Sequence, residues 1–257
     1  MPSRILVPTD GSEPATAALE HTLDIASERN AIVHLLHVAD TNEPSLTRLG
    51  TEVVDVLEQE GEELVSEAAT LAEDRGVSVV TDVVQGDPRP TIVDYAATGP
   101  FEYVAMGAHG RRGLGEYVLG SVTDHVVNRS PVPVLTVRAT DDVMPQYPYT
   151  DILVPTDGSD HATAALELAT TVAKRNGARL HLLSIVDELP EMIDTGSAQL
   201  SEQLEANIQE MLDEAAATAT EAGVDDVPTT IATGSIPQEV TTYADEEGID
   251  LVVMGTH

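Results

Sequence analysis

A glycine-rich stretch, MGAHGRRGLGEYVLGS, runs from Met106 to Ser121. Glycine lets a backbone turn tightly and approach a ligand closely, and the amides of such a turn can bind an anion. Ser121 begins a predicted helix, so its hydroxyl, the free amides of the first turn and the Thr123 hydroxyl could hold a phosphate. Arg111 and Arg112 would then supply positive charge for a polyphosphate. A flexible surface loop followed by an ordinary serine cap is the other interpretation of the stretch on its own.

Several known chemistries do not fit these residues. There is no GxxxxGK[ST] motif, so a P-loop ATPase is excluded, and no GxGxxG follows the first predicted strand, which argues against a dinucleotide fold. Ser121, Asp124 and His125 lie too close together on one helix for a catalytic triad. His109 has no second ligand at metal-binding spacing, so we expect it to face a ligand or to pack.

The charge of the chain is extreme. It carries 45 Asp and Glu against 12 Lys and Arg, for a formal net charge of −33, and Lys174 is its one lysine. This charge excludes nucleic acid and anionic membranes as partners. Most of the carboxylates are explained by a solvated surface, but their surplus over lysine resembles that of halophilic proteins. Because self-repulsion destabilises a compact chain unless salt screens it, we expect the fold to loosen in low salt.

The composition also limits the compartment and the chemistry. Cysteine is absent, which excludes disulfides, thiolate metal sites and a cysteine nucleophile. The start of the chain, MPSRILVPTDG, has no long apolar signal region, and no run reaches membrane-spanning length. We therefore expect a cytoplasmic protein. Hydrophobic residues make up 42 % of the 257 residues, which is enough for a packed core.

An internal repeat predicts the domain organisation. The segment ILVPTDGSEPATAALE, which starts at Ile5, returns as ILVPTDGSDHATAALE, which starts at Ile152. Later in each copy, YVAMGAH from Tyr103 matches LVVMGTH from Leu251. We therefore predict two tandem domains, residues 1–138 and 151–257, joined by a polar linker at 139–150 that carries two prolines.

Within the first repeat, short apolar runs alternate with helical patterns. Predicted strands cover Arg4–Pro8, Ala31–Val38, Val77–Val84, Phe101–Met106 and Val132–Val137. Predicted helices cover Ser12–Asn30, about Glu52–Arg75, Arg89–Ala97 and Ser121–Arg129. This alternation indicates an α/β fold with a parallel sheet and helices on both faces. Ligands in such folds bind beyond the carboxyl ends of the strands, where PTDGS and MGAHG follow strands one and four. His34 and His37, on strand two, are interpreted as ordinary strand residues.

These motifs carry a family resemblance. Gly107-x2-Gly110-x9-Gly120-Ser121 after a fourth strand, together with ILVPTDGS, resembles the ATP-binding branch of the universal stress protein family. The segment GSVTDHVVNRSPVPVLTV, from Gly120 to Val137, is similar to the last helix and strand of that family. The resemblance implies a doubly wound, Rossmann-like sheet of order 3-2-1-4-5 that binds ATP, ADP or AMP. Because a bound nucleotide usually brings Mg²⁺, a divalent cation that bridges the phosphates is expected with it.

The resemblance also implies a set of site residues. Pro8, Thr9 and Asp10 would lie at the adenine and ribose, and Val38 would line the adenine pocket through its backbone. The carboxylate of Asp10 can accept hydrogen bonds from ribose hydroxyls or the adenine amine. Its alternative role is to cap the next helix, for which Ser12 competes. The ribose and phosphates would be surrounded by Met106, Gly107, His109, Gly110, Arg111, Gly120, Ser121, Val122 and Thr123, and Gly86 would help to close the pocket.

The second repeat carries only part of this motif. Its adenine half would consist of Pro155, Thr156, Asp157, Ile185, Met254 and Gly255, and the phosphate half, the last helix and strand five have no counterpart before His257. We therefore predict one competent site, in the first repeat. Members of the family often dimerise by pairing fifth strands. Strand Val132–Val137 is accordingly expected to form an edge that can pair with a second copy as a homodimer.

The leading functional hypothesis is an ATP-binding stress-response or signalling protein whose nucleotide state is read by an unidentified protein partner. No residue is placed to activate water, so catalysis would be limited to slow ATP hydrolysis or autophosphorylation. One alternative is an adenylating enzyme of the related adenine-nucleotide alpha-hydrolase fold, although PTDGS stands where such enzymes carry a Ser-Gly-Gly loop. Another is an interaction module that binds no nucleotide.

Overall fold

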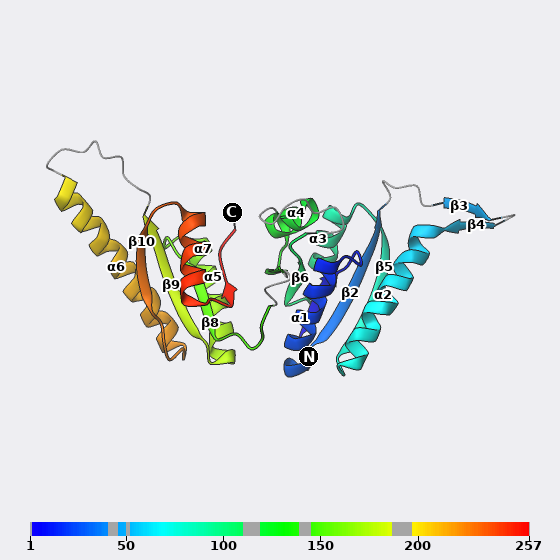
Figure 1. Cartoon of the computed structure of the whole chain (residues 1–257), viewed down its shortest axis with the longest axis horizontal. Coiled ribbons are helices and arrows are strands. Elements are labelled where there is room, and N and C mark those ends of the chain that lie inside the picture. Colours follow the sequence, from blue (N-terminus) through cyan, green and yellow to red (C-terminus); the bar gives the residue numbers. More distant parts are fainter. Residues whose placement is uncertain are drawn as a thin grey trace. The chain divides into compact units, whose positions relative to one another are not determined.

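The computed structural model describes residues 2–40, 46–49, 52–109, 119–138, 145–186 and 197–256. The chain forms two compact units, Met1–Tyr147 and Pro148–His257, and each contains one copy of the repeat. In each unit, helices pack against a parallel sheet (Figure 1). None of the described helices is long and apolar enough to span a bilayer.

The sheet of the first unit has the predicted topology. Its strands are β1 (Arg4–Pro8), β2 (Ile32–Asp40), β5 (Ser78–Gly86), β6 (Tyr103–Gly107) and β7 (Val134–Val137). They are ordered β5-β2-β1-β6-β7, and all neighbours are parallel. Numbered along the chain without the small hairpin described below, this order is 3-2-1-4-5, which confirms the predicted doubly wound α/β fold. The strand order reverses between β1 and β6, which is where ligands bind in such sheets.

Helices cover both faces of this sheet and create two apolar cores. The helices are α1 (Glu13–Arg29), α2 (Val56–Asp74), α3 (Pro88–Thr98) and α4 (Ser121–Arg129). Ile5 and Val7 of β1 pack in the core beneath α1 and α2, whereas Leu6 packs on the opposite face with residues of α3 and α4. Successive side chains of a strand point to opposite faces, and all three are 0 % exposed. Coverage of both faces therefore explains the unbroken apolar run in this strand.

One predicted boundary is wrong. The helix expected from about Glu52 begins at Val56. The residues before it form β4 (Glu52–Asp55), which pairs antiparallel with β3 (Leu46–Leu49). The two consecutive valines of β4 are β-branched and favour extended backbone, which the helical periodicity of the following residues conceals.

The second unit has fewer elements. Its strands are β8 (Asp151–Pro155), β9 (Arg179–Val186), β10 (Thr229–Thr233) and β11 (Leu251–Val252). Its helices are α5 (Asp160–Asn176), α6 (Ser197–Glu221) and α7 (Ile236–Glu247). The sheet order is β10-β9-β8-β11, which is 3-2-1-4 along the chain. Within the described residues, this unit therefore has no counterpart of α4 and β7, as the sequence predicted.

The missing elements leave apolar side chains exposed on the second unit. In the first unit, Val104 and Met106 of β6 are 0 % and 6 % exposed. Val252 and Met254, at the matching positions of the second unit, are 37 % and 53 % exposed. The difference follows from the layers, because α4 and β7 cover this side of the sheet in the first unit, and the described part of the second unit has no such elements.

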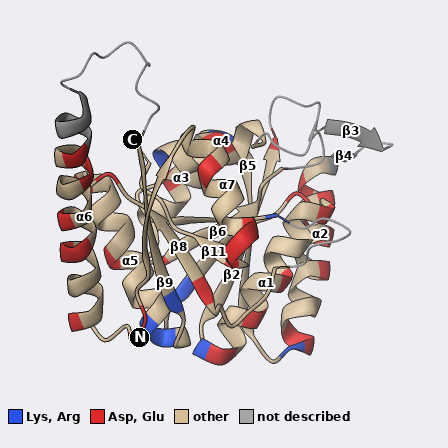
Figure 2. Cartoon of the chain, turned by 60° about the vertical axis from the view of Figure 1, so that its left-hand side comes forward, with Lys and Arg blue, Asp and Glu red and all other residues tan. Residues whose placement is uncertain are grey.

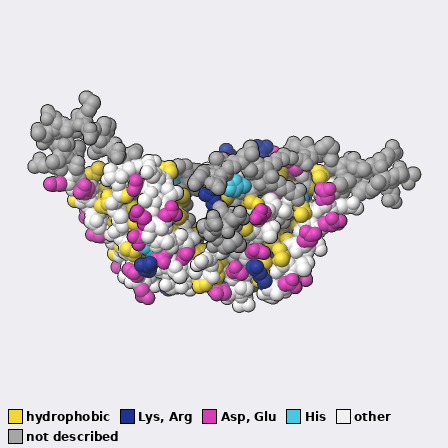
Figure 3. All heavy atoms as spheres, viewed as in Figure 1, with side chains coloured by type: hydrophobic (Ala, Val, Ile, Leu, Met, Phe, Trp, Pro, Cys, Tyr) yellow, Lys and Arg dark blue, Asp and Glu magenta, His cyan; other side chains and the backbone are white. Residues whose placement is uncertain are grey.

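Acidic side chains lie along the outer faces of α2 and α6, as Figure 2 shows. On the face drawn in Figure 3 they are widely spread, with few basic side chains between them. Ion pairs such as Arg29–Glu102 and Arg75–Asp24 neutralise some of the acidic residues, but the net charge of −33 means that most have no basic counterpart.

We therefore predict that the melting temperature rises with salt. Between 0.1 M and 3 M KCl the Debye length falls from about 10 Å to below about 3 Å, which removes most of the repulsion between exposed carboxylates. The expected increase is about 5–10 °C, equivalent to about 2–3 kcal/mol for a chain of this size. Thermal unfolding followed by circular dichroism measures it. Equal melting temperatures at the two salt concentrations would contradict the prediction.

Candidate functional site

The carboxyl end of β1 leads into a tight, hydrogen-bonded turn. The Thr9 amide donates to the Leu36 carbonyl of β2 at 2.9 Å, so the turn starts from a fixed point. The Ser12 amide then donates to Asp10 Oδ1 at 3.0 Å, and the Gly11 amide donates to Thr9 Oγ1 at 3.2 Å. Gly11 has a φ of 72°, which explains why glycine occupies this position. The turn holds the Asp10 carboxylate at the tip of the central strand.

The structure separates this carboxylate from the cap of the following helix. Ser12 is the N-cap of α1, and its Oγ accepts from the Ala15 amide at 3.4 Å. Asp10 lies before the helix, and the hydrogen bond that its carboxylate accepts from the Ser12 amide stays within the turn. The alternative role of Asp10 as the helix cap is therefore filled by Ser12.

The tip of β6 is held against the start of α1. A Cβ atom built on Gly107 would lie 2.7 Å from both the carbonyl carbon and oxygen of Pro14, so no larger residue fits without moving the backbone. The Gly107 carbonyl accepts from the Thr123 hydroxyl at 2.9 Å, and the Gly120 amide donates to the Ala108 carbonyl at 2.8 Å. These contacts bring the end of β6 and the start of α4 together.

Helix α4 begins without a side-chain cap. Its N-cap is Gly120, in extended backbone, and no side chain accepts from the first turn at this position. The amides of a first helical turn have no partner within the helix, so they can bind an anion. Ser121 is exposed and Val122 is partly buried, whereas Thr123 is 3 % exposed and uses its hydroxyl proton on Gly107. The hydroxyl of Thr123 therefore ties the start of α4 to the end of β6 rather than pointing to solvent.

The side chains of two further predicted residues are buried in the core. Val38, near the end of β2, and Met106, in β6, are 9 % and 6 % exposed and belong to the same core cluster. His109, within the glycine-rich stretch, is partly buried and is the last described residue before position 110. Gly110 and Arg111, like the rest of 110–118, lie outside the described residues, so their predicted roles at the phosphates stay predictions.

The second repeat builds the same turn at the end of β8. The Ser159 amide donates to Asp157 Oδ1 at 2.9 Å, and the Thr156 amide donates to a carbonyl of β9 at 2.8 Å. A Cβ atom on Gly255 would lie 2.6 Å from the His161 carbonyl oxygen, so this glycine also approaches the adjacent helix closely. Of the other residues predicted for this half-site, Met254 is exposed, and Pro155 and Ile185 are partly buried.

Sequence reasoning missed a polar cluster under the first sheet. His34 Nε2 lies 2.6 Å from Asp82 Oδ2, and the Tyr95 hydroxyl donates to the same oxygen at 2.5 Å. The bond from Tyr95 is the main cause of a lowered pKa at Asp82, and the bond from His34 adds to it. Burial, together with the bond to Asp82, raises the pKa of Tyr95 well above its ordinary value. The one signal of this cluster in the sequence was Asp82, a carboxylate within the largely apolar strand VSVVTDVV.

The second unit repeats this cluster with a different acid. His181 Nε2 lies 3.0 Å from Asp151 Oδ1, and His181 Nδ1 lies 3.1 Å from the Tyr243 hydroxyl. Burial alone would raise the pKa of Asp151, but hydrogen bonds from His181 and Thr150 and the nearby charge of Arg179 lower it overall. The first cluster joins β2 to β5, and the second joins β8 to β9.

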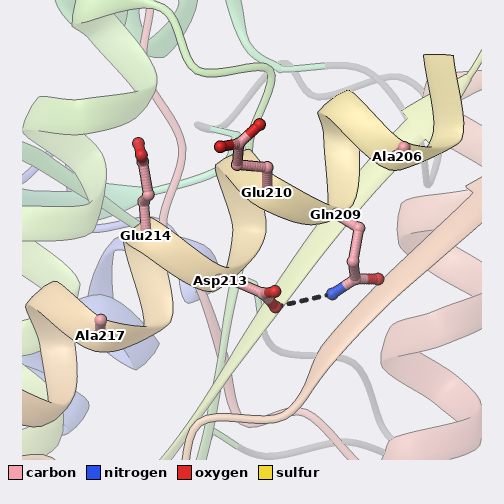
Figure 4. A pocket seen from close by; sticks show the side chains of 6 residues that line it. All are labelled: Ala206, Gln209, Glu210, Asp213, Glu214 and Ala217. Atoms are coloured by element: carbon pink, nitrogen blue, oxygen red, sulfur yellow. Dashed lines mark hydrogen bonds between the residues drawn. The ribbon is translucent and has the colours of Figure 1, made fainter. Parts of the chain in front are cut away.

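A hollow on α6 has no part in the predicted site. Figure 4 shows that all of its lining side chains come from this one helix, with Gln209 Nε2 donating to Asp213 Oδ1 at 2.8 Å. The lining residues are Ala206, Gln209, Glu210, Asp213, Glu214 and Ala217. Three carboxylates make the hollow unsuitable for a phosphate, since like charges repel.

The sequence model of the Universal stress protein family matches residues 1–138 and again residues 148–257. The chain belongs to the universal stress protein family. Universal stress protein Rv2005c of Mycobacterium tuberculosis is 30 % identical over 218 residues, which cover 81 % of this chain and 73 % of the relative. A crystal structure of a universal stress protein from Archaeoglobus fulgidus covers 97 % of this chain and 85 % of its own, with a TM-score of 0.69 and 23 % identity, and it shares the fold.

Another solved universal stress protein is described as a complex with cAMP. It is 25 % identical, covers 54 % of this chain and 98 % of its own, and has a TM-score of 0.44. The bound cAMP is a property of that protein.

The close contact at Gly107 gives a first test of the site's packing. We predict that Gly107→Ala destabilises the protein by about 1–3 kcal/mol, because the added methyl group overlaps the Pro14 backbone. Denaturant unfolding in molar KCl measures the change. A second substitution, Pro14→Ala, is expected to give no rescue, because it leaves the carbonyl carbon and oxygen in place. Full stability in Gly107→Ala would show that the two tips do not meet as described.

The cluster at Asp82 predicts a pH dependence. Because its pKa is lowered in the folded state, the ionised carboxylate stabilises the fold above its unfolded pKa near 3.8, and this contribution is lost as pH falls through the folded pKa. We expect Asp82→Asn to destabilise by about 1 kcal/mol at pH 7. The difference from the parent chain should shrink below about pH 4.

The matched control for this pH experiment is Asp94→Asn. Asp94 is an exposed residue of α3, and its substitution removes the same charge outside the cluster. In so acidic a chain, relief of repulsion should make this control neutral or slightly stabilising. Unfolding curves from pH 3 to pH 8 compare the two variants. An Asp82→Asn variant that behaves like Asp94→Asn would contradict the prediction.

Proposed function

We propose that the first repeat binds an adenine nucleotide, ATP or its ADP or AMP form, where β1, β2 and β6 end and α4 begins. Membership of the universal stress protein family supports the proposal, as does the spacing of Gly107, Gly110, Gly120 and Ser121 that resembles its ATP-binding branch. The extreme acidity of the chain makes a local, backbone-built phosphate site the physically reasonable way to bind an anion.

One observation carries the proposal. At the point where the strand order reverses, two glycines place backbone rather than side chains at the carboxyl edge of the sheet. Gly107 lies against the first turn of α1, beside the Asp10 turn, and Gly120 opens α4 without a side-chain cap. The same edge of one sheet thereby supplies a carboxylate for the ribose or adenine amine and helix amides for the phosphates.

The proposed contacts divide between the two ends of the nucleotide. The adenine and ribose would contact Pro8, Thr9, Asp10 and the backbone of Val38. The ribose and phosphates would contact Met106, Gly107, His109, Gly110, Arg111, Gly120, Ser121, Val122 and Thr123. Thr123 would act by ordering the loop, since its hydroxyl already donates to Gly107. Any Mg²⁺ would be held chiefly by the phosphates and would neutralise their charge.

The second repeat would hold only the base and ribose half of such a site. Asp157 lies in a turn equivalent to that of Asp10. Gly255 approaches the start of α5 as closely as Gly107 approaches the start of α1. Pro155, Thr156, Ile185 and Met254 would complete this half. Without an equivalent of α4 among the described residues, the phosphates would lack helix amides, so we expect weak binding of a nucleoside at most.

Nucleotide occupancy would act as a signal through the segment from Gly107 to Ser121. A partner protein must bind the occupied and empty states with different affinities for such a signal to be read. The β7 strand is an edge of its sheet and would pair with a second copy in a homodimer.

Stoichiometry tests the site. We predict one equivalent of ATP per chain by calorimetry in molar KCl, and release of an adenine nucleotide, identified by mass spectrometry, from protein purified in high salt. Asp10→Ala and Gly120→Val should remove binding, because they delete the carboxylate and place a branched side chain over the first amides of α4. Asp157→Ala, in the matching turn of the second repeat, is the control and should bind like the parent chain.

Three outcomes would count against the proposal. Two equivalents of tightly bound ATP would contradict the single site, and unchanged binding in Asp10→Ala would contradict its location. Pyrophosphate release from ATP with an added acid substrate would favour an adenylating enzyme instead.

A further inference from the structure

His37 of β2 links the strand tip to α2 on the face of the sheet away from α3. Its Nδ1 lies 2.9 Å from the Thr9 carbonyl oxygen. A carbonyl oxygen has no proton, so Nδ1 must be the donor. The Thr9 amide also donates to β2, to the carbonyl of Leu36 at 2.9 Å. Both polar backbone groups of Thr9 are therefore held by successive residues of the neighbouring strand.

We propose that His37 is a positioning residue for the nucleotide, because it fixes the peptide that carries Asp10. The inference rests on the proposed function, in which Asp10 binds the ribose or adenine. With the amide and the carbonyl of Thr9 both anchored, the next residue has little freedom in the direction of its side chain. The carboxylate is thus oriented before the nucleotide binds, which lowers the entropy cost of binding.

Helix α2 leaves room for this ring through a glycine. A Cβ atom on Gly61 would lie 2.5 Å from His37 Cδ2 and 3.0 Å from Val83 Cγ1. Glycine in a helix interior costs about 1 kcal/mol relative to alanine, so its presence here needs a reason. The imidazole supplies one, because any side chain at position 61 would displace it from the Thr9 carbonyl.

The second repeat has residues of the opposite size at the positions that match His37 and Gly61. In the matching segments HLLHVAD and HLLSIVD, Ser184 stands where the first repeat has His37. Helices α2 and α6 are each followed closely by a glycine, Gly76 and Gly223. Counting back 15 residues from these glycines matches Gly61 with Ile208. A large strand residue and a helix glycine in the first repeat thus correspond, by sequence position, to a small strand residue and a helix isoleucine in the second. Total volume is roughly conserved, and the ring donor is found in the repeat with the complete glycine motif.

A swap of this pair separates packing from positioning. His37→Ser with Gly61→Ile installs the pair of the second repeat and should keep stability near that of the parent chain. Its affinity for ATP should nevertheless fall about tenfold, the equivalent of about 1.4 kcal/mol. Gly61→Ile alone should lose both stability and affinity, because the isoleucine meets the ring. Calorimetry with ATP in molar KCl and denaturant unfolding give the two readouts.

Two single substitutions test the hydrogen bond itself. The amide nitrogen of His37→Asn can occupy the place of Nδ1, so affinity should stay within about twofold of the parent chain. His37→Leu keeps the bulk without the donor and should lose about tenfold in affinity. Equal affinities for the asparagine and leucine variants, or full affinity in the double variant, would overturn the role of His37. A parent chain that binds no nucleotide would instead overturn the proposed function and this inference with it.

Discussion

The contact on which the site depends is the close approach of the β6 tip to the first turn of α1. It is possible because Gly107 has no Cβ, which would otherwise lie 2.7 Å from the Pro14 backbone. The approach places the end of β6 beside the turn that carries Asp10, at the reversal point of the sheet. Thr123 and Gly120 then bond to the residues of this tip, so the start of α4 is attached to it. Backbone geometry, more than any side chain, thus brings these three segments together.

The sequence predicted the fold well because its signals are local. Apolar runs, glycine and proline punctuation and a long internal repeat predicted the alternating strands and helices, the parallel sheet and the duplication, and they placed α4 at Ser121–Arg129. The strand order came from the family resemblance. The β3–β4 hairpin was missed because its two valines precede a strong helical period. The polar roles of His34 and His37 were missed because their partners, Asp82 and the Thr9 carbonyl, lie on neighbouring strands, and strand register cannot be read from one sequence. Residues at the strand tips were placed by the family motif rather than by physics.

The two repeats show how far a duplicated sheet can diverge while its framework is kept. Each unit buries a histidine against a tyrosine on the helix that follows strand three. The acid differs: Asp82 lies opposite Leu36 in the register of β2 and β5, whereas Thr230 occupies the matching place opposite Leu183. In the second unit Asp151 of the central strand bonds the histidine instead. A buried imidazole requires a partner, but either neighbouring strand can supply it.

The acidity of the chain bears on the kind of phosphate site that could work. A site built from surface lysines would lose most of its attraction in molar salt, where exposed charges interact only over about 3 Å. Amides at the start of a helix act by direct hydrogen bonds at contact distance, and a partly enclosed contact is screened much less. Low salt would strengthen any attraction from basic residues, but it would also increase the repulsion of the carboxylates for a polyphosphate. A backbone site at the start of a helix is therefore compatible with nucleotide binding at the high salt concentrations in which we expect the fold to be most stable.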